Sequence, residues 1–168
     1  MARILEPMIG ELQQEALVTK RILERVPADK LTWKPHPKSM SLGQLALHIA
    51  TIPGTLSKMS LLDEFEIAPA AFDFVAPKDV SEILAALDAS VKAAEENVGG
   101  LSDTDAMGNW RLVRSGKELL SLPRAGMLRS IMLNHWYHHR GQLSVYLRLL
   151  DIPVPSIYGP SADENPFA

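Results

Sequence analysis

The chain has 168 residues, of which 46% are apolar and 22% are charged, and its formal net charge is −3. This length and apolar content suit a single domain with one core, so we predict one domain over residues 1–168. No run of Lys or Arg forms the basic stripe that a phosphate backbone requires, which argues against a nucleic-acid partner. Because cysteine is absent, disulfides, thiolate nucleophiles and Cys-based zinc sites are excluded, and any metal chemistry falls to His and carboxylates.

The chain shows no sign of a membrane segment. The N-terminal region meets Pro7 and several Glu and Gln residues before any apolar signal core could form, and nowhere do about 18 apolar residues run together. We therefore expect a cytoplasmic protein without a membrane partner.

Two helices are predicted in the first third of the chain. Apolar residues recur at three- and four-residue spacing from Pro7 to Arg25, and Pro27 then acts as a stop signal. The proline-rich stretch 33–39 is predicted to be an extended connector. Ser41 and Gln44 form a capping-box pattern that begins a second helix toward Leu62, with a kink or break expected near Pro53.

The middle of the chain mixes helical and non-helical signals. Residues 63–78 contain Phe65, Phe72, Phe74, Pro69 and Pro77, so this segment is expected to lie over one end of the helices. A third helix is predicted from a cap at Asp79 or Ser81 to the Gly99-Gly100 pair. Between Trp110 and Leu122, two short apolar runs flank Ser115-Gly116, which suggests a hairpin, although residues 117–122 could equally begin a helix.

A long fourth helix is predicted from Pro123 or Arg124 to Leu150, followed by a proline-rich tail whose first half packs and whose last residues fray. The fold class is therefore all-α: a four-helix bundle with long connections and a short hairpin before the last helix. At about 100° per residue, one line on the last helix collects seven residues within about 40°. These are Leu128, Ile131, His135, His139, Gln142, Tyr146 and Leu149.

Three histidines are the candidate metal ligands. His135 and His139 are one helical turn apart and point with the apolar residues, and their Cβ atoms are expected about 6 Å apart, close enough to share one ion. His48 lies in an apolar run of the second helix, and three imidazoles would leave one coordination position open for chemistry. Taken singly, His48 could instead be a hydrogen-bonded core residue, and the His135–His139 pair could be an accident of the helix surface or of the core.

Other residues give weaker signals. His138 could replace His139 as a ligand or act in the second shell, whereas His36 lies between two prolines and is expected to be exposed. The Asp63-Glu64 and Glu95-Glu96 pairs lack the Glu-x-x-His spacing of a di-iron bundle. Ser130 and Ser144 lie away from the histidine line and no nucleophile elbow is present, so a serine triad is not expected.

Three blocks of sequence resemble the DinB-like (damage-inducible) family. They are residues 42–50 (LGQLALHIA), 134–143 (NHWYHHRGQL) and 155–164 (PSIYGPSADE), and the His-His-Arg-Gly-Gln run within the second is the most specific part. The resemblance implies a four-helix bundle, often dimeric, with a metal held by three histidines that correspond here to His48, His135 and His139. Nickel and zinc are the metals usually associated with such folds, with iron and manganese as further candidates. The family is also similar to transferases that use bacillithiol, mycothiol or glutathione.

Three functions follow as hypotheses. The first is a metal-dependent thiol S-transferase that acts on a small-molecule substrate. The second is a metal-dependent hydrolase, for which the sequence provides no general base, and the third is a stress-response protein in which the metal only ties two helices together. The residues considered for the second shell or for substrate contact are His138, Arg140, Gln142 and Tyr158, with Arg124 as a further candidate for steering an anion.

The last helix also indicates a partner. Leu133, Trp136, Tyr137 and Leu147 lie away from the histidine line and form more apolar surface than one solvated face should carry. We expect the tail or the first helix to cover part of this surface, and a homodimer to cover the rest.

Overall fold

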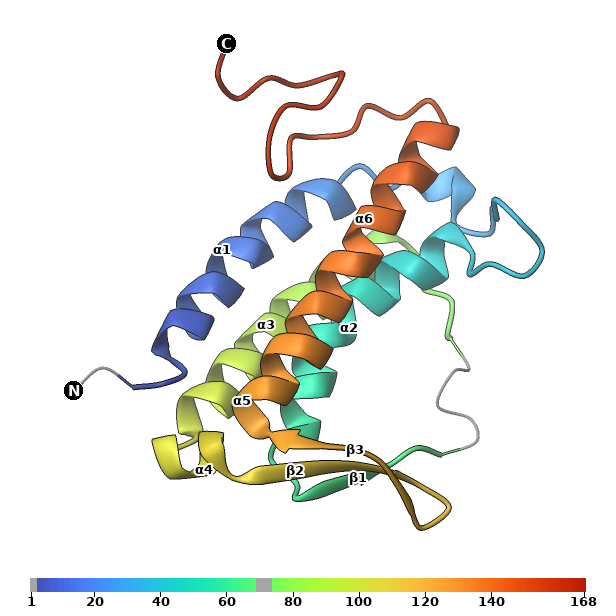
Figure 1. Cartoon of the computed structure of the whole chain (residues 1–168). Coiled ribbons are helices and arrows are strands. Elements are labelled where there is room, and N and C mark those ends of the chain that lie inside the picture. Colours follow the sequence, from blue (N-terminus) through green and yellow to red (C-terminus); the bar gives the residue numbers. More distant parts are fainter. Residues whose placement is uncertain (1–2, 69–73) are drawn as a thin grey trace.

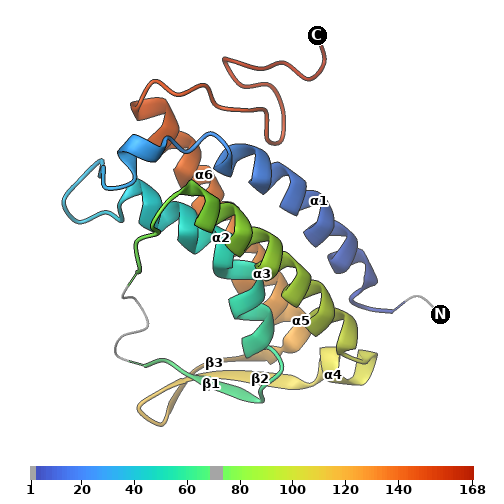
Figure 2. The ribbon, with the colours of Figure 1, turned by 180° about the vertical axis from the view of Figure 1, so that it is seen from behind.

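The computed structural model describes residues 3–68 and 74–168 of the chain. Four long helices lie side by side, and a small sheet closes one end of the group (Figure 1). The long helices are α1 (Glu6–Leu23), α2 (Leu42–Met59), α3 (Val80–Gly100) and α6 (Asn134–Leu149). Seen from behind, α2 and α3 lie in front of α6, and the C-terminal tail crosses the end of the helices that lies opposite the sheet (Figure 2). Two short helices, η1 (Ala28–Lys30) and α4 (Asp103–Met107), lie in the connections that follow α1 and α3.

The caps of α2 and α3 follow from their sequences. The Ser41 hydroxyl accepts a hydrogen bond from the Gln44 amide at 3.2 Å, and the Gln44 side chain accepts one from the Ser41 amide at 2.9 Å. This confirms the capping box at the start of α2. Asp79 caps α3 by accepting from the Glu82 amide at 3.0 Å, as one of the two predicted caps.

Pro53 lies inside α2 without ending it, and the residue after it, Gly54, lies at the close contact of α2 with α3. The Pro53 ring disturbs the local helical hydrogen bonds. The next amide, that of Gly54, donates to Ser90 Oγ of α3 at 2.8 Å. A Cβ atom at Gly54 would lie 3.0 Å from the Ser90 Cα and carbonyl oxygen, so glycine permits the two backbones to approach.

The predicted helix from residue 123 or 124 to 150 is one continuous helical rod with an irregular part. It begins with α5 (Arg124–Met127), continues as a π-helical segment η2 (Leu128–Leu133), and becomes the regular helix α6. A π segment carries an extra residue per turn and changes the direction of the side chains around it. The seven residues that were predicted to share one face at 100° per residue do not all face the core, because the last of them, Leu149, is 59% exposed.

The all-α prediction is wrong in one respect, because the helices are joined by a three-stranded sheet. Strands β2 (Asn109–Arg114) and β3 (Lys117–Pro123) form the predicted hairpin, and its turn uses positive φ angles at Ser115 and Gly116. Strand β1 (Glu64–Glu66) pairs in parallel with β2, placing Phe65 opposite Leu112. The polar-apolar-polar pattern of β1 spans only three residues, which is too few for alternation to predict a strand.

The segment around β1 lies at the end of the bundle, as expected for residues 63–78. Phe65 of β1 packs against the core, and Trp110 of β2 is fully buried, with its indole donating to the Met59 carbonyl at 3.1 Å. Phe72 and Pro69, which contributed to that prediction, lie outside the described residues.

The tail packs through its first half, where Val154 and Ser156 are buried. Asp163 holds it by accepting from the Val154 amide at 2.9 Å and by pairing with Arg148 of α6. Within the part of the chain that the structure describes, no helix is both long and apolar enough to cross a membrane.

Candidate metal centre

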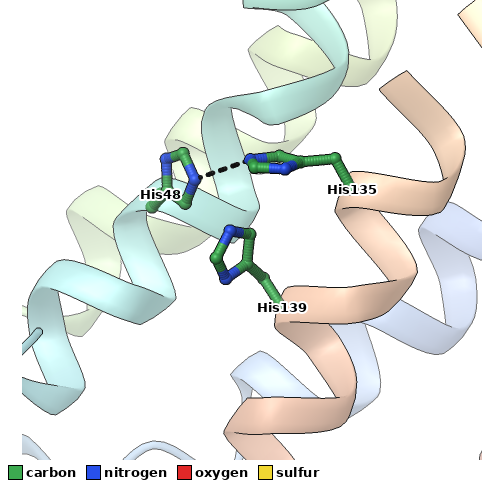
Figure 3. A group of neighbouring side chains, drawn as sticks. All are labelled: His48, His135 and His139. Carbon is green, nitrogen blue, oxygen red and sulfur yellow. Dashed lines mark hydrogen bonds between the residues drawn. The ribbon is translucent and has the colours of Figure 1, made fainter. Parts of the chain in front are cut away.

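Three imidazoles from two helices face one point between α2 and α6. His48 lies in the first half of α2, and His135 and His139 lie one turn apart near the start of α6 (Figure 3). The π-helical segment η2 ends at Leu133, two residues before His135, and such segments are frequent at functional sites. We call His48, His135 and His139 the histidine cluster.

The distances in the histidine cluster suit a shared ion. The Nε2 atoms of His48 and His135 are 3.1 Å apart, and each of the three residues offers a ring nitrogen within 4.8 Å of the other two. Two nitrogens bound at about 2.0–2.1 Å to one ion lie about 2.9–3.4 Å apart for bond angles of roughly 90–110°. The cluster could therefore hold a metal ion with small adjustments of its rings.

The surroundings keep the imidazoles neutral, which is the form that binds metals. Burial lowers the pKa of His48 to about 4, and the positive charges that His139 and His135 would carry contribute further. Burial likewise lowers the pKa of His135 to about 4, and it lowers the pKa of His139. At neutral pH each ring thus has a lone pair on one of its two nitrogens.

Gln142 fixes the orientation of one of these rings. The His139 Nδ1 atom lies 2.7 Å from Gln142 Oε1, and because an amide oxygen only accepts, Nδ1 must carry the proton. The lone pair of His139 is then on Nε2. The Gln142 carboxamide therefore sets the tautomer of the His139 ring. On the other side of the cluster, the ring of His48 meets the Phe74 ring edge-on, with 4.8 Å between centroids.

The structure places the remaining candidates elsewhere. His138 is exposed and its ring contacts His139, but it is not one of the grouped donors, and His36 is exposed on its loop as expected. Arg124 is buried and bonds to the Ser60 carbonyl at 2.9 Å and to Asp63, holding the sheet end together rather than steering a substrate.

Arg140 and Tyr158 also have structural partners. Arg140 is 1% exposed and pairs with Glu15 of α1 at 2.5 Å, while donating to Thr19 Oγ1 at 3.0 Å. The Tyr158 hydroxyl, in the tail, bonds to Arg140 and donates to Glu15 at 2.9 Å. Both side chains therefore join α1, α6 and the tail.

The apolar side chains that were expected to need a second chain to cover them are covered within this chain. Leu133, Trp136 and Leu147 are fully buried, and the hydroxyl of the half-buried Tyr137 donates to Glu11 of α1 at 2.9 Å. The argument for a homodimer from these residues was wrong, and the homodimer stays a prediction without this support.

A cavity of about 970 Å³ adjoins the histidine cluster. All three histidines line it, together with apolar residues of α2, η2 and the sheet. Its volume lies at the upper end of the range for small-molecule sites. The cavity was not predicted, because its sheet wall depends on the parallel pairing of β1 with β2. The aromatic content around Phe65 and Phe74 was the only signal of it in the sequence.

Comparisons with known proteins agree with this fold. The chain is 27% identical over 166 residues to the uncharacterized protein YrdA of Bacillus subtilis strain 168, which covers 98% of this chain and 93% of the relative. A crystal structure of a DinB-like protein from Bacillus cereus matches with a TM-score of 0.71 and 27% identity, covering 94% of this chain and all of the other.

More distant structures share the fold alone. A DinB-like protein from Bacillus subtilis matches with a TM-score of 0.65 at 18% identity, covering 87% of this chain and 93% of that one. A putative member of the family from Exiguobacterium sibiricum matches with a TM-score of 0.57 at 20% identity, covering 92% and 95%. The model of the DinB family matches residues 1–165. With almost its whole length matched, the chain belongs to the DinB family.

Proposed function

We propose that the chain is a divalent-metal-dependent enzyme, and more specifically a thiol S-transferase. The observation that carries this proposal is the histidine cluster at the wall of a large cavity, where any ion on the three imidazoles would be accessible to a substrate. Three protein ligands with one open position are typical of catalytic sites, whereas structural sites are usually closed by a fourth protein ligand. Among the described residues, only these three histidines group in this way.

The donor set limits the choice of metal. Imidazole nitrogens suit zinc, nickel, copper and iron, and hard ions such as manganese prefer oxygen ligands. Zinc and nickel are the first metals to test, followed by iron and manganese. A bound divalent cation would act as a Lewis acid that lowers the pKa of a thiol.

The residues of the chain would supply position and environment. Gln142 holds the ring of His139, and the buried surroundings keep His48 and His135 unprotonated. The apolar cavity wall would displace water from the part of a substrate that it contacts. In the transfer, the thiol sulfur bonds to an electrophilic carbon, the leaving group departs with its electron pair, and the thiol proton passes to solvent.

A hydrolase fits the site less well. Metal-dependent hydrolysis commonly uses a carboxylate as general base. Over residues 3–68 and 74–168, no Asp or Glu lines the cavity beside the histidine cluster. The transferase is therefore the better-supported enzyme.

The test is a conjugation assay with chlorodinitrobenzene and a panel of thiols that contains bacillithiol, mycothiol and glutathione. Wild type, His135→Ala and His36→Ala are compared after loading with zinc or nickel. His36 is a matched control because it is exposed on a loop and lies outside the cluster. We expect turnover in wild type and His36→Ala and its loss in His135→Ala. Equal turnover in all three proteins would refute metal-dependent transfer.

A further inference from the structure

The described residues that line the cavity beside the histidine cluster carry no charged side chain. In the described part of the chain, the residues that line it contain neither Lys nor Arg, and neither Asp nor Glu. Most of the wall is formed by aliphatic, methionine and aromatic side chains, among them Leu56, Met59 and Ile131 from helical segments and Phe65, Trp110 and Leu112 from the sheet. Charged residues make up 22% of the whole chain, so the described lining residues contain fewer charged side chains than the chain average.

Most polar groups on the wall already have partners within the chain. Gln44 donates to the Phe74 carbonyl at 2.8 Å and accepts from the Ser41 amide. The Thr51 hydroxyl donates to the Leu47 carbonyl at 3.0 Å, and the Trp110 indole donates to Met59. Among the described lining residues, a ligand therefore meets few free polar groups apart from the imidazoles.

This distribution of polarity constrains the ligand. A charged group buried against such a wall would lose its hydration and gain no counter-charge, which costs several kcal/mol. A hydrophobic molecule gains from burial there, and the flexible side chains of Met59 and Met127 can adapt to its shape. Among the described lining residues, the three histidines of the cluster offer ring nitrogen atoms to a polar or reactive group.

We propose that the cavity binds an uncharged, hydrophobic small molecule whose one reactive polar group points at the histidine cluster. The inference rests on the proposed function in taking this cavity as the substrate site. It assigns the cavity to the electrophilic substrate. The charged parts of a thiol such as glutathione then lie outside this wall, with only the sulfur reaching the cluster.

The first test uses two fluorescent probes that share one aromatic framework. N-phenylnaphthylamine is neutral, and anilinonaphthalenesulfonate adds a sulfonate to the same rings. Each is titrated into metal-free wild-type protein in the presence of a chelator. We expect the neutral probe to bind at least about tenfold more tightly, because the sulfonate would have to leave water without a cationic partner. Equal or tighter binding of the sulfonate would overturn the proposal.

A matched pair of variants shows whether the probe occupies this cavity. Leu112→Trp adds volume to the sheet wall, and Leu119→Trp makes the same change at an exposed position of β3 outside the lining. We expect Leu112→Trp to weaken the neutral probe about tenfold or more and Leu119→Trp to leave it unchanged. Should Leu112→Trp fail to fold, Ile131→Phe makes the corresponding change on the η2 wall. Equal binding by wild type and a folded filling variant would contradict the assignment.

The two proposals can fail separately. If the protein takes up no divalent metal but binds the neutral probe in this cavity, the proposed function fails and the ligand assignment stands. If it takes up metal but does not distinguish the two probes, the ligand assignment fails and the metal-dependent function stands.

Discussion

Replacement of Arg140 by Met should destabilise the fold and leave metal binding intact. The guanidinium is 1% exposed, and the side chain of its partner Glu15 is 14% exposed, so the ion pair is almost completely removed from water. Met keeps most of the apolar length of the side chain but removes the charge and the bond to Thr19. The Glu15 carboxylate is then buried with only the Tyr158 hydroxyl as a donor among these partners.

Breaking a buried pair by removing one partner costs about 3–5 kcal/mol, and the residual exposure of Glu15 favours the lower end, about 3 kcal/mol. For a domain of this size, that corresponds to a fall in Tm of about 6–12 °C. The double variant Arg140→Met with Glu15→Gln should recover part of the loss, since no carboxylate is left uncompensated. Thermal and urea unfolding give these values, and elemental analysis gives the metal content. A Tm within about 2 °C of wild type, or loss of metal at unchanged Tm, would show that Arg140 does not act through this ion pair.

Three further predictions concern the site and the helix packing. Gln142→Leu should lower metal affinity by about 10–100-fold, because the ring of His139 loses the partner that fixes its tautomer; competition with a chromogenic chelator measures this, and unchanged affinity would contradict it. Gly54→Ala should destabilise the fold by about 1–3 kcal/mol in urea unfolding, because the new Cβ would lie 3.0 Å from backbone atoms of Ser90; a neutral or stabilising effect would mean that α2 and α3 are not so close. Finally, His48 and His135 have pKa values of about 4 in the folded protein and an ordinary value of 6.5 when unfolded. Between pH 4 and pH 6.5, the unfolded chain therefore binds more protons than the folded protein. Metal-free protein should therefore lose stability as the pH falls from 6.5 toward 4, and a flat Tm across this window would contradict the burial of the cluster.

The sequence predicted the long helices well because each has local signals. The capping residues Ser41 and Asp79, and the glycine pair that ends α3, act within one turn of the chain and need no tertiary contact. The same holds for the hairpin, where a Ser-Gly pair between two apolar runs adopts positive φ angles.

The parts that could not be predicted depend on contacts between distant segments. Strand β1 exists because residues 64–66 pair with residues 111–113, and its own sequence, Glu-Phe-Glu, is too short for its alternation to predict a strand. The buried ion pair of Arg140 with Glu15 joins α6 to α1. The sequence motif suggested that Arg140 contacts a substrate, but its partner Glu15 lies on another helix and could not be predicted from the motif. The apolar face of α6 was likewise mistaken for surplus surface, because the sequence does not say how much of it α1 and the tail cover.

The convergence of the histidines was predictable in part. Spacing within one helix brought His135 and His139 together, and an apolar context indicated that His48 faces the core. Periodicity cannot decide whether residues of two helices meet, and this depends on the packing of α2 against the last helical rod. The cavity beside them is also lined by residues of the sheet, so local sequence patterns could not predict it.

The central claim is that His48, His135 and His139 together bind one divalent ion. The most direct measurement is X-ray absorption on protein loaded with zinc or nickel, combined with native mass spectrometry of wild type, His135→Ala and His36→Ala. We expect one ion per chain and three imidazole nitrogens at about 2.0–2.1 Å for zinc, retained in His36→Ala and lost in His135→Ala. A chain that takes up no ion, or an ion whose coordination is unchanged in His135→Ala, would contradict the claim.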